Sequence, residues 1–299
     1  MAVTAASERR RSGLRQALRS VGAFCGAQPV AAASLVLILA FVCAGLFARQ
    51  LAPFDPLDVD YASILTPPDS LHWFGTDAFG RDIFSRLIHG ARSALTIGLI
   101  SAVLGCSIGA TIGIFSAYFG GRFDAILQRA LELLLAFPLV VLALVIVAIL
   151  GRNPVYGVDV TLILAIAIPM VAPVSRVLRA AALSVRKQPF VDAAITAGYS
   201  HSRVVFRHMM PNLVAPFLVM LSSYIAQAIL LESTLSFLGL GVSEPVPSWG
   251  LMLSGNAADF FETAPWLIVF PGLAISLAVI AFNLFGDGLR DWLDPRFQT

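Results

Sequence analysis

The chain has 299 residues, of which 58% are hydrophobic and 13% are charged, and its formal net charge is +2. A soluble domain normally carries about a quarter charged residues, so this composition excludes an ordinary soluble protein. The excess apolar surface requires lipid around it.

Six apolar stretches are long enough for a membrane-spanning helix, which needs roughly 20 mostly apolar residues. In chain order they are approximately 30–47, 95–119, 125–150, 160–178, 213–238 and 266–285. Their apolar residues are continuous, without the alternation of barrel strands, and this favours helices over a β-barrel. The sequence therefore predicts an all-α membrane protein with six transmembrane helices.

Arginine placement predicts the orientation, because basic residues collect in cytoplasmic loops. With the N-terminus inside, 15 of the 20 basic residues fall on the cytoplasmic side and 5 fall outside. Both termini are therefore expected in the cytoplasm. Arg11, Arg15 and Arg19 repeat every four residues, which indicates either an amphipathic helix on the inner leaflet or a solvated basic tail. The basic region is long and no clear cleavage pattern follows it, so an uncleaved first helix is expected.

The first outer segment, residues 50–92, carries two pairs of opposite charges at helical i,i+4 spacing. These pairs are Asp77 with Arg81 and Asp82 with Arg86. They predict a short helix at the outer interface that leads into the second span.

The second outer segment, residues 239–265, is rich in glycine, proline and serine and is expected to be turn-rich. Trp249 and Trp266 are expected to lie at the lipid headgroups, where tryptophan is enriched.

Ionisable residues inside spans are costly and are functional candidates by default. Glu132 lies three residues after Arg129, so a structural ion pair accounts for it. Glu232 has no such neighbour. It is expected either to line a pathway or gate between subunits or to be an interfacial carboxylate that reaches water.

Motifs for chemistry are scarce. The single lysine, Lys187, does not form the Gly-Lys-Ser/Thr end of a phosphate-binding loop, so any ATP hydrolysis is expected in another chain. His201 and His208 are seven residues apart, which misses the spacing of a helical zinc pair, and no metal is expected. No hydrolase string such as Gly-x-Ser-x-Gly is present, so a membrane-embedded enzyme has no positive support.

The stretch from 191 to 212, VDAAITAGYSHSRVVFRHMMPN, looks soluble although apolar runs flank it. Its apolar patches fit two short helices with Gly198 at the turn between them, where a positive φ can be required. Pro211 is expected to begin the next helix, since proline is tolerated in a first turn. The prediction is a helix–turn–helix elbow that projects from the membrane. The alternative is a loop that merely covers the inner ends of the spans.

The elbow carries a resemblance to a known family. The pattern Asp192-Ala193-Ala194-x-x-x-Gly198, followed thirteen residues later by Pro211, resembles the Glu-Ala-Ala loop of permeases in ATP-binding-cassette importers. Asp192 stands where that family has glutamate. Five further strings resemble the dipeptide/oligopeptide branch of this family, and its C-type permease subunit in particular. They are WFGTDAFGRDIFSRLIHGARSAL, LLLAFPLV, FRHMMPN, LSFLGLGVSEPVPSWG and FNLFGDGLRDWLDPR.

The resemblance implies a MetI-like permease fold in the bacterial inner membrane, with a coupling helix at about 190–208 that sits in a cleft of an ATPase. Asp192 would meet an arginine there, and Arg203 and Arg207 would face an acidic rim. The two alanines would form a small-residue face for close docking.

The implied partners are a second homologous permease in a heterodimer, two ATPase subunits, an extracytoplasmic solute-binding protein and the lipid bilayer; no nucleic acid and no cofactor are expected. The implied function is the permease of an ATP-driven importer of peptides or related solutes, and the chain itself is not expected to be an enzyme. An importer of glutathione or nickel complexes is the alternative. A stand-alone secondary transporter or channel is more remote, because the sequence shows no ion-coupling cluster or matching broken helices.

The expected organisation has three parts. Residues 1–92 hold the N-terminal amphipathic segment, the first transmembrane helix and the extracytoplasmic loop. Residues 93–290 form a five-helix permease core that contains the coupling helix, and residues 291–299 form a cytoplasmic tail.

Overall fold

The structure is a computed structural model that describes residues 22, 25–155, 158–257 and 259–293. The expected amphipathic helix around Arg11, Arg15 and Arg19, and the tail beyond residue 293, lie outside the described residues. The α-helices in chain order are α2 (Pro29–Leu46), α3 (Ala48–Leu51), α4 (Ile83–Phe119), α5 (Gly121–Leu135), α6 (Leu139–Leu150), α7 (Val160–Arg186), α8 (Pro189–Thr196), α9 (His201–Arg203), α10 (Val214–Phe237), α11 (Trp249–Leu253) and α12 (Trp266–Leu293). Two short strands, β1 (Pro154–Val155) and β2 (Val158–Asp159), pair antiparallel.

The all-α prediction is confirmed, and in the described part of the chain five helices are long and apolar enough to cross a membrane. They are α2, α4, α7, α12 and the helix from His201 to Phe237 that contains α10. The remaining expected span, 125–150, is not continuous, because α5 and α6 meet at an angle of 89°. Pro138 lies at the break, and proline disfavours helical conformation in the residue before it. The chain has six spans if this bent pair counts as one.

The second span begins earlier than expected. The sequence predicts a separate interfacial helix before it, whereas α4 is one uninterrupted helix of 37 residues that starts at Ile83. Asp82 is its N-cap and accepts a hydrogen bond from the backbone N–H of Ser85 at 2.8 Å. A capped start of this kind satisfies one of the free N–H groups of the first turn and fixes where the helix begins.

Helices α4 and α7 pack closely along much of their length. A Cβ atom on Gly105 would lie 2.6 Å from the carbonyl oxygen of Ala167, and one on Gly109 would lie 2.6 Å from that of Val171. Gly105, Gly109 and Gly113 lie at positions i, i+4 and i+8 on one face of α4, and small residues at this spacing let two helix backbones approach closely in a membrane. The spacing of these glycines was the available signal for this contact.

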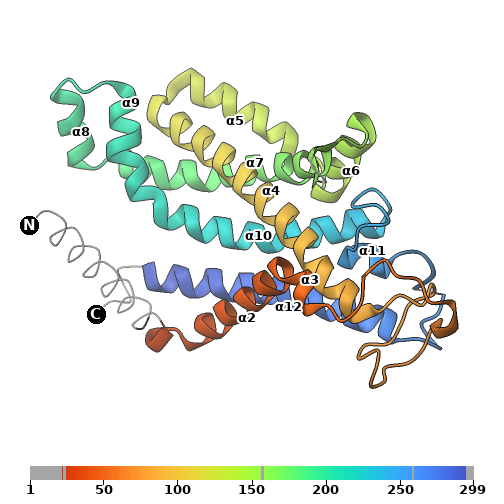
Figure 1. Ribbon diagram of the computed structural model, residues 1–299. Coiled ribbons are helices and arrows are strands. Elements are labelled where there is room, and N and C mark those ends of the chain that lie inside the picture. Colours follow the sequence, from red (N-terminus) through yellow and green to blue (C-terminus); the bar gives the residue numbers. More distant parts are fainter. Residues whose placement is uncertain (1–21, 23–24, 156–157, 258, 294–299) are drawn as a thin grey trace, which may run out of the picture.

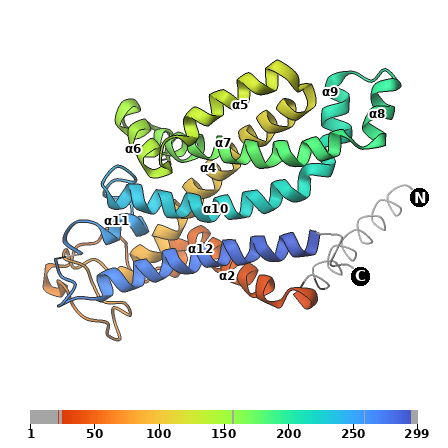
Figure 2. The ribbon, with the colours of Figure 1, turned by 180° about the vertical axis from the view of Figure 1, so that it is seen from behind.

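The loops are sorted to opposite ends of the helices. Both ribbon views place the elbow with α8 and α9 at one end and the two outer segments at the other (Figures 1 and 2). Trp249 does not lie at the headgroups as expected: it is buried, its indole N–H donates to the carbonyl of Leu87 at 2.9 Å, and its ring meets Phe41 edge-on. Trp266 is half-buried and donates to the carbonyl of Thr76 at 3.1 Å. The two tryptophans therefore fasten the outer segments to the helices.

Candidate coupling elbow and outer charge network

The elbow is formed by α8, a tight turn and α9. The turn has the hydrogen bonds of a Schellman motif: the N–H of Gly198 donates to the carbonyl of Ile195 at 2.9 Å, and the N–H of Tyr199 donates to that of Ala194 at 3.2 Å. Gly198 has φ +74°, in the left-handed region that favours glycine. The expected positive φ at Gly198 is confirmed.

The α8 helix has one inward and one outward face. Val191 and Ala194 are 0% and 5% exposed and pack on Val204, Val205 and Met209. Residues three apart share a helix face, so Ala194 follows Val191 into the core. The expectation of one docking face made by both alanines is therefore wrong, because Ala194 packs inward.

The exposed face holds Ala193 and Asp192, whose side chain is 67% exposed. Arg186, at the end of α7, donates to Asp192 Oδ1 at 3.1 Å, so the carboxylate already has a partner inside this chain. Arg203 lies over the ring of Tyr199 at 4.1 Å, while Arg207 is exposed. The elbow therefore presents one carboxylate and two arginines at its surface.

Three long helices hold the elbow in place. Tyr118 near the end of α4 has its hydroxyl 2.7 Å from His201 Nδ1, and Arg186 of α7 pairs with Asp192. His208 instead stacks on Tyr199, so the two histidines do not share a site. In the described residues no group of three or more potential metal ligands occurs.

The third connection is the chain itself. Helical conformation runs from His201 to Phe237 through a π-helical segment, Val204–Met209, and a 3-10 turn, Met210–Leu213. Pro211 lies in the first turn of this 3-10 segment, as expected of a proline, but the segment continues the preceding helix and does not begin a separate one. A proline ring collides with the carbonyl four residues earlier, and local 3-10 and π adjustments such as these are how membrane helices accommodate a proline. The elbow is thereby continuous with α10.

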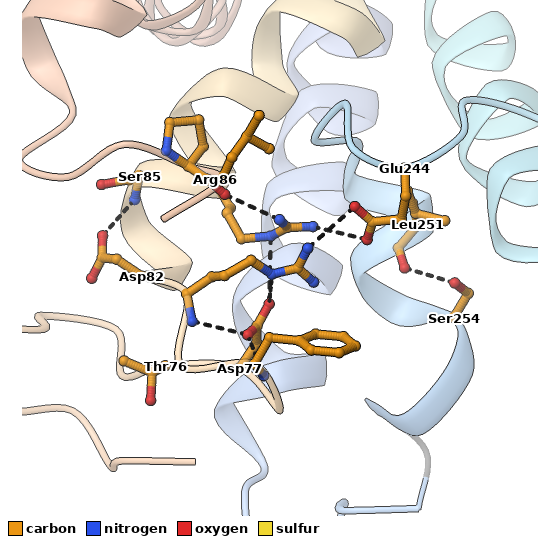
Figure 3. A network of polar contacts seen from close by, with 12 residues as sticks. Thr76, Asp77, Asp82, Ser85, Arg86, Glu244, Leu251 and Ser254 are labelled. Atoms are coloured by element: carbon orange, nitrogen blue, oxygen red, sulfur yellow. Dashed lines mark hydrogen bonds and ion pairs between the residues drawn. The ribbon is translucent and has the colours of Figure 1, made fainter. Parts of the chain in front are cut away.

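At the end of the molecule opposite the elbow, four charged side chains from two distant segments form a network (Figure 3). Arg81 donates to Asp77 at 2.7 Å and to Glu244 at 3.2 Å. Arg86 lies 3.7 Å from Asp77 and 3.4 Å from Glu244, and its side chain is 2% exposed. The Asp77–Arg81 pair is thus confirmed. The Asp82–Arg86 pair is wrong, because Asp82 caps α4.

This network joins the two outer segments beside a cleft of about 270 Å³. Glu244 was not identified from the sequence because 158 residues separate it from Arg86. The segment around Asp77 is further fastened by Asp82, whose Oδ1 lies 3.0 Å from Nδ1 of the buried His72.

Glu232 of α10 is completely buried in the subunit, so the expectation of a water-reaching carboxylate is wrong. Ser236 and Ser248 donate to its Oε1 at 2.8 and 3.0 Å, and Ser233 approaches its Oε2 at 3.4 Å. Ser248 belongs to the second outer segment, so Glu232 fastens that segment to α10. A pathway or gate role for Glu232 stays a prediction.

These features define a class: a multi-pass helical membrane protein with loops at both ends and a helical elbow anchored to several spans. Residues 109–299 match the family described as "Binding-protein-dependent transport system inner membrane component". The chain belongs to this family, and it is an inner-membrane component of a transport system that depends on a binding protein.

Several relatives cover nearly the whole chain. A dipeptide transport system permease protein of Alkalihalophilus pseudofirmus is 38% identical over 90% of this chain and 87% of its own. A putative peptide transport system permease protein of Brucella suis is 42% identical over 89% and 87%. A glutathione transport system permease protein of Escherichia coli is 38% identical over 91% and 88%.

Proposed function

We propose that this chain is the membrane-spanning permease subunit of an ATP-driven importer of peptides or related small solutes. Its partners would be a second homologous permease, two ATPase subunits and an extracytoplasmic solute-binding protein. The family and the names of its peptide-transporting relatives support this function. Hydrolysis of ATP would take place in the partner ATPases and would be transmitted through the elbow, residues 189–208.

The observation that carries the proposal is the construction of the elbow. It exposes a small charged surface while its inner face is buried against the ends of α4, α7 and α10. Buried apolar contacts of this kind are close-packed and transmit displacement. A partner that moves Asp192 and Ala193 therefore also moves three spans.

The role of Asp192 is tested by separating its internal partner from the external one. Asp192→Lys removes the ion pair with Arg186 and also opposes any cation on an ATPase. The double variant Arg186→Glu, Asp192→Lys restores an ion pair within the elbow with reversed sign, but leaves the wrong charge for the ATPase.

We expect both variants to insert normally and to lose the ATPase in pull-downs. Loss of a buried charged pair at an interface costs about 2–5 kcal/mol, a weakening of about 30-fold or more. Asp192→Asn, which keeps the shape, should retain part of the binding. Full recovery of ATPase binding in the double variant would show that Asp192 serves only the internal pair with Arg186, and the docking role would be withdrawn.

The orientation is proposed from the arginine distribution, with both termini and the elbow in the cytoplasm. Asp58, Glu262 and Lys187 are exposed and therefore suit cysteine labelling. In intact cells an impermeant thiol reagent should label cysteine at positions 58 and 262 but not at 187. The reverse pattern would overturn the orientation.

Glutathione import is the second candidate, favoured by relatives that carry that name. Competition for uptake separates the two: excess unlabelled glutathione should leave peptide uptake unchanged if the system is a peptide importer. Complete inhibition by glutathione, without inhibition by peptides, would select the alternative.

A further inference from the structure

A groove of about 380 Å³ lies between α10 and α12, both of which belong to helices long and apolar enough to span the membrane. Two carboxamide side chains line it, Gln227 from α10 and Asn283 from α12, and the rest of the lining is formed by Ser223, Tyr224, Ala226, Leu230 and Val279. Both amide residues are exposed, whereas Ala226 beside Gln227 is buried. The groove therefore presents two amide groups among mostly apolar side chains.

Neither amide has a hydrogen-bond partner among the residues that the structure describes. Other polar side chains on the same exposed part of α10 are satisfied by their own helix. Ser223 donates to the carbonyl of Val219 at 3.3 Å, and Thr234 donates to that of Leu230 at 2.8 Å. Gln227 and Asn283 are thus two residues of the groove whose amide donors and acceptors are free within the described part of the chain.

Lipid is a poor covering for this surface. An amide without a hydrogen bond in an apolar medium costs roughly 2–7 kcal/mol, and polar groups in spans face protein or a water-filled cavity. The helices are also held close beside the groove, since a Cβ on Gly286 would collide with the Ser222 side chain. The groove is therefore a polar site between two closely packed helices of membrane-spanning length.

The chemistry of the two amides restricts the ligand. Each carries an N–H donor and a carbonyl acceptor and no charge. A peptide bond has the same two groups, in every peptide and independently of its side chains. Neither Gln227 nor Asn283 carries the opposite charge that favours a charged headgroup, and two amide oxygens are fewer than the roughly six to eight oxygen ligands that a cation such as Ca²⁺ takes.

Building on the proposed function, we propose that this groove lies on the solute pathway and that Gln227 and Asn283 hydrogen-bond the backbone of a passing peptide. Gln227 is on the helix that continues into the elbow, and Asn283 is on α12. A displacement of α10 against α12 would bring the two amides into or out of register with one peptide. The site would thus hold peptides of differing sequence in one conformation and release them in another.

The test uses the whole complex in proteoliposomes, with its ATPases, second permease and binding protein. The probes are tri-alanine and an analogue in which both peptide nitrogens are methylated, each at saturating binding protein. The variants are Gln227→Leu and Asn283→Leu, and the matched control is Thr234→Val, which removes a hydroxyl already satisfied within α10. Any preference of the binding protein itself cancels, because the same binding protein serves all variants.

We expect Gln227→Leu and Asn283→Leu each to slow tri-alanine uptake by about 2- to 10-fold, the size of one hydrogen bond between neutral groups. The loss should be smaller for the methylated analogue, which lacks the peptide N–H, and the control should transport both peptides at the wild-type rate. The ATPases should remain bound throughout.

Unchanged tri-alanine uptake in both leucine variants would overturn the proposal. So would an equal loss for the two peptides, or loss of the second permease from the complex, since either result assigns the groove to subunit packing. Failure of the proposed function looks different: the wild-type complex would retain its ATPases and import neither peptide.

Discussion

The turn at Gly198 allows a backbone effect to be separated from a steric one. Its φ of +74° disfavours any side chain, yet a Cβ added there would meet nothing within 4 Å. The cost of Gly198→Ala therefore comes from the left-handed conformation alone, about 1–2 kcal/mol. Gly198→Val should cost more because β-branched residues resist positive φ, whereas Gly198→Asn should cost less because asparagine visits this region routinely.

A loss of 1–2 kcal/mol in the turn reduces the population of the correctly formed elbow relative to its alternatives by about 5- to 30-fold. If the elbow docks on an ATPase, the measured Kd should weaken in the order Gly, Asn, Ala, Val. Titration of labelled ATPase against each variant in nanodiscs measures this order. Equal weakening by Asn, Ala and Val would refute the backbone argument and would indicate that an added side chain collides with the partner. Wild-type affinity in all three would remove the turn from the coupling mechanism.

Three further substitutions test the packing. Gly109→Ala should lower the melting temperature by several degrees, since overpacking costs about 1–3 kcal/mol. Gly272→Ala, in open space within α12, should not lower it, because alanine favours a helix more than glycine does. Equal melting temperatures of the two variants would contradict the close α4–α7 approach. Glu232→Gln should keep near-wild-type thermal stability, because its amide oxygen still accepts hydrogen bonds from the serine hydroxyls. Glu232→Leu should lose about 1–3 kcal/mol of stability for each hydroxyl left without a partner. A transport defect in a stable Glu232→Gln protein would support the pathway role instead. Arg86→Met removes the buried guanidinium that pairs with Asp77 and Glu244. It should destabilise the outer segments by about 1.5–3 kcal/mol, the contribution of a hydrogen bond to a charged group, and by more than Glu244→Gln does at its 49% exposed position. Hydrogen exchange of the outer segments measures both, and the reverse ranking would contradict the network.

Features set by neighbouring residues could be predicted from the sequence. The apolar runs predicted the long helices, and the Arg129–Glu132 spacing predicted an ion pair that is present at 3.1 Å. Gly198 predicted its own turn, because glycine is the residue that tolerates positive φ without cost. Each of these depends on interactions within a few residues of chain.

Features set by distant segments could not. The i,i+4 spacing predicted a pair between Asp82 and Arg86. In the structure Asp82 caps α4 and contacts His72, and Arg86 instead pairs with Glu244. Glu232 appeared unpartnered because Ser248 lies in the following loop, sixteen residues away. A single sequence does not show which residues of such distant segments lie opposite one another, so these contacts became visible only in the structure.

The length of α4 has a mechanical consequence. At about 1.5 Å per residue its 37 residues extend about 55 Å, well beyond the roughly 30 Å of a hydrocarbon core. One rod therefore carries Arg86 of the outer network at one end and Tyr118, the contact to the elbow, at the other, about 48 Å apart along the axis. A tilt of about 5° about one end would displace the other by about 4 Å over that length. The charge network and the elbow thus lie at opposite ends of one helix, so a small rotation of α4 at the network would by geometry alone displace the elbow contact by an atomic-scale distance.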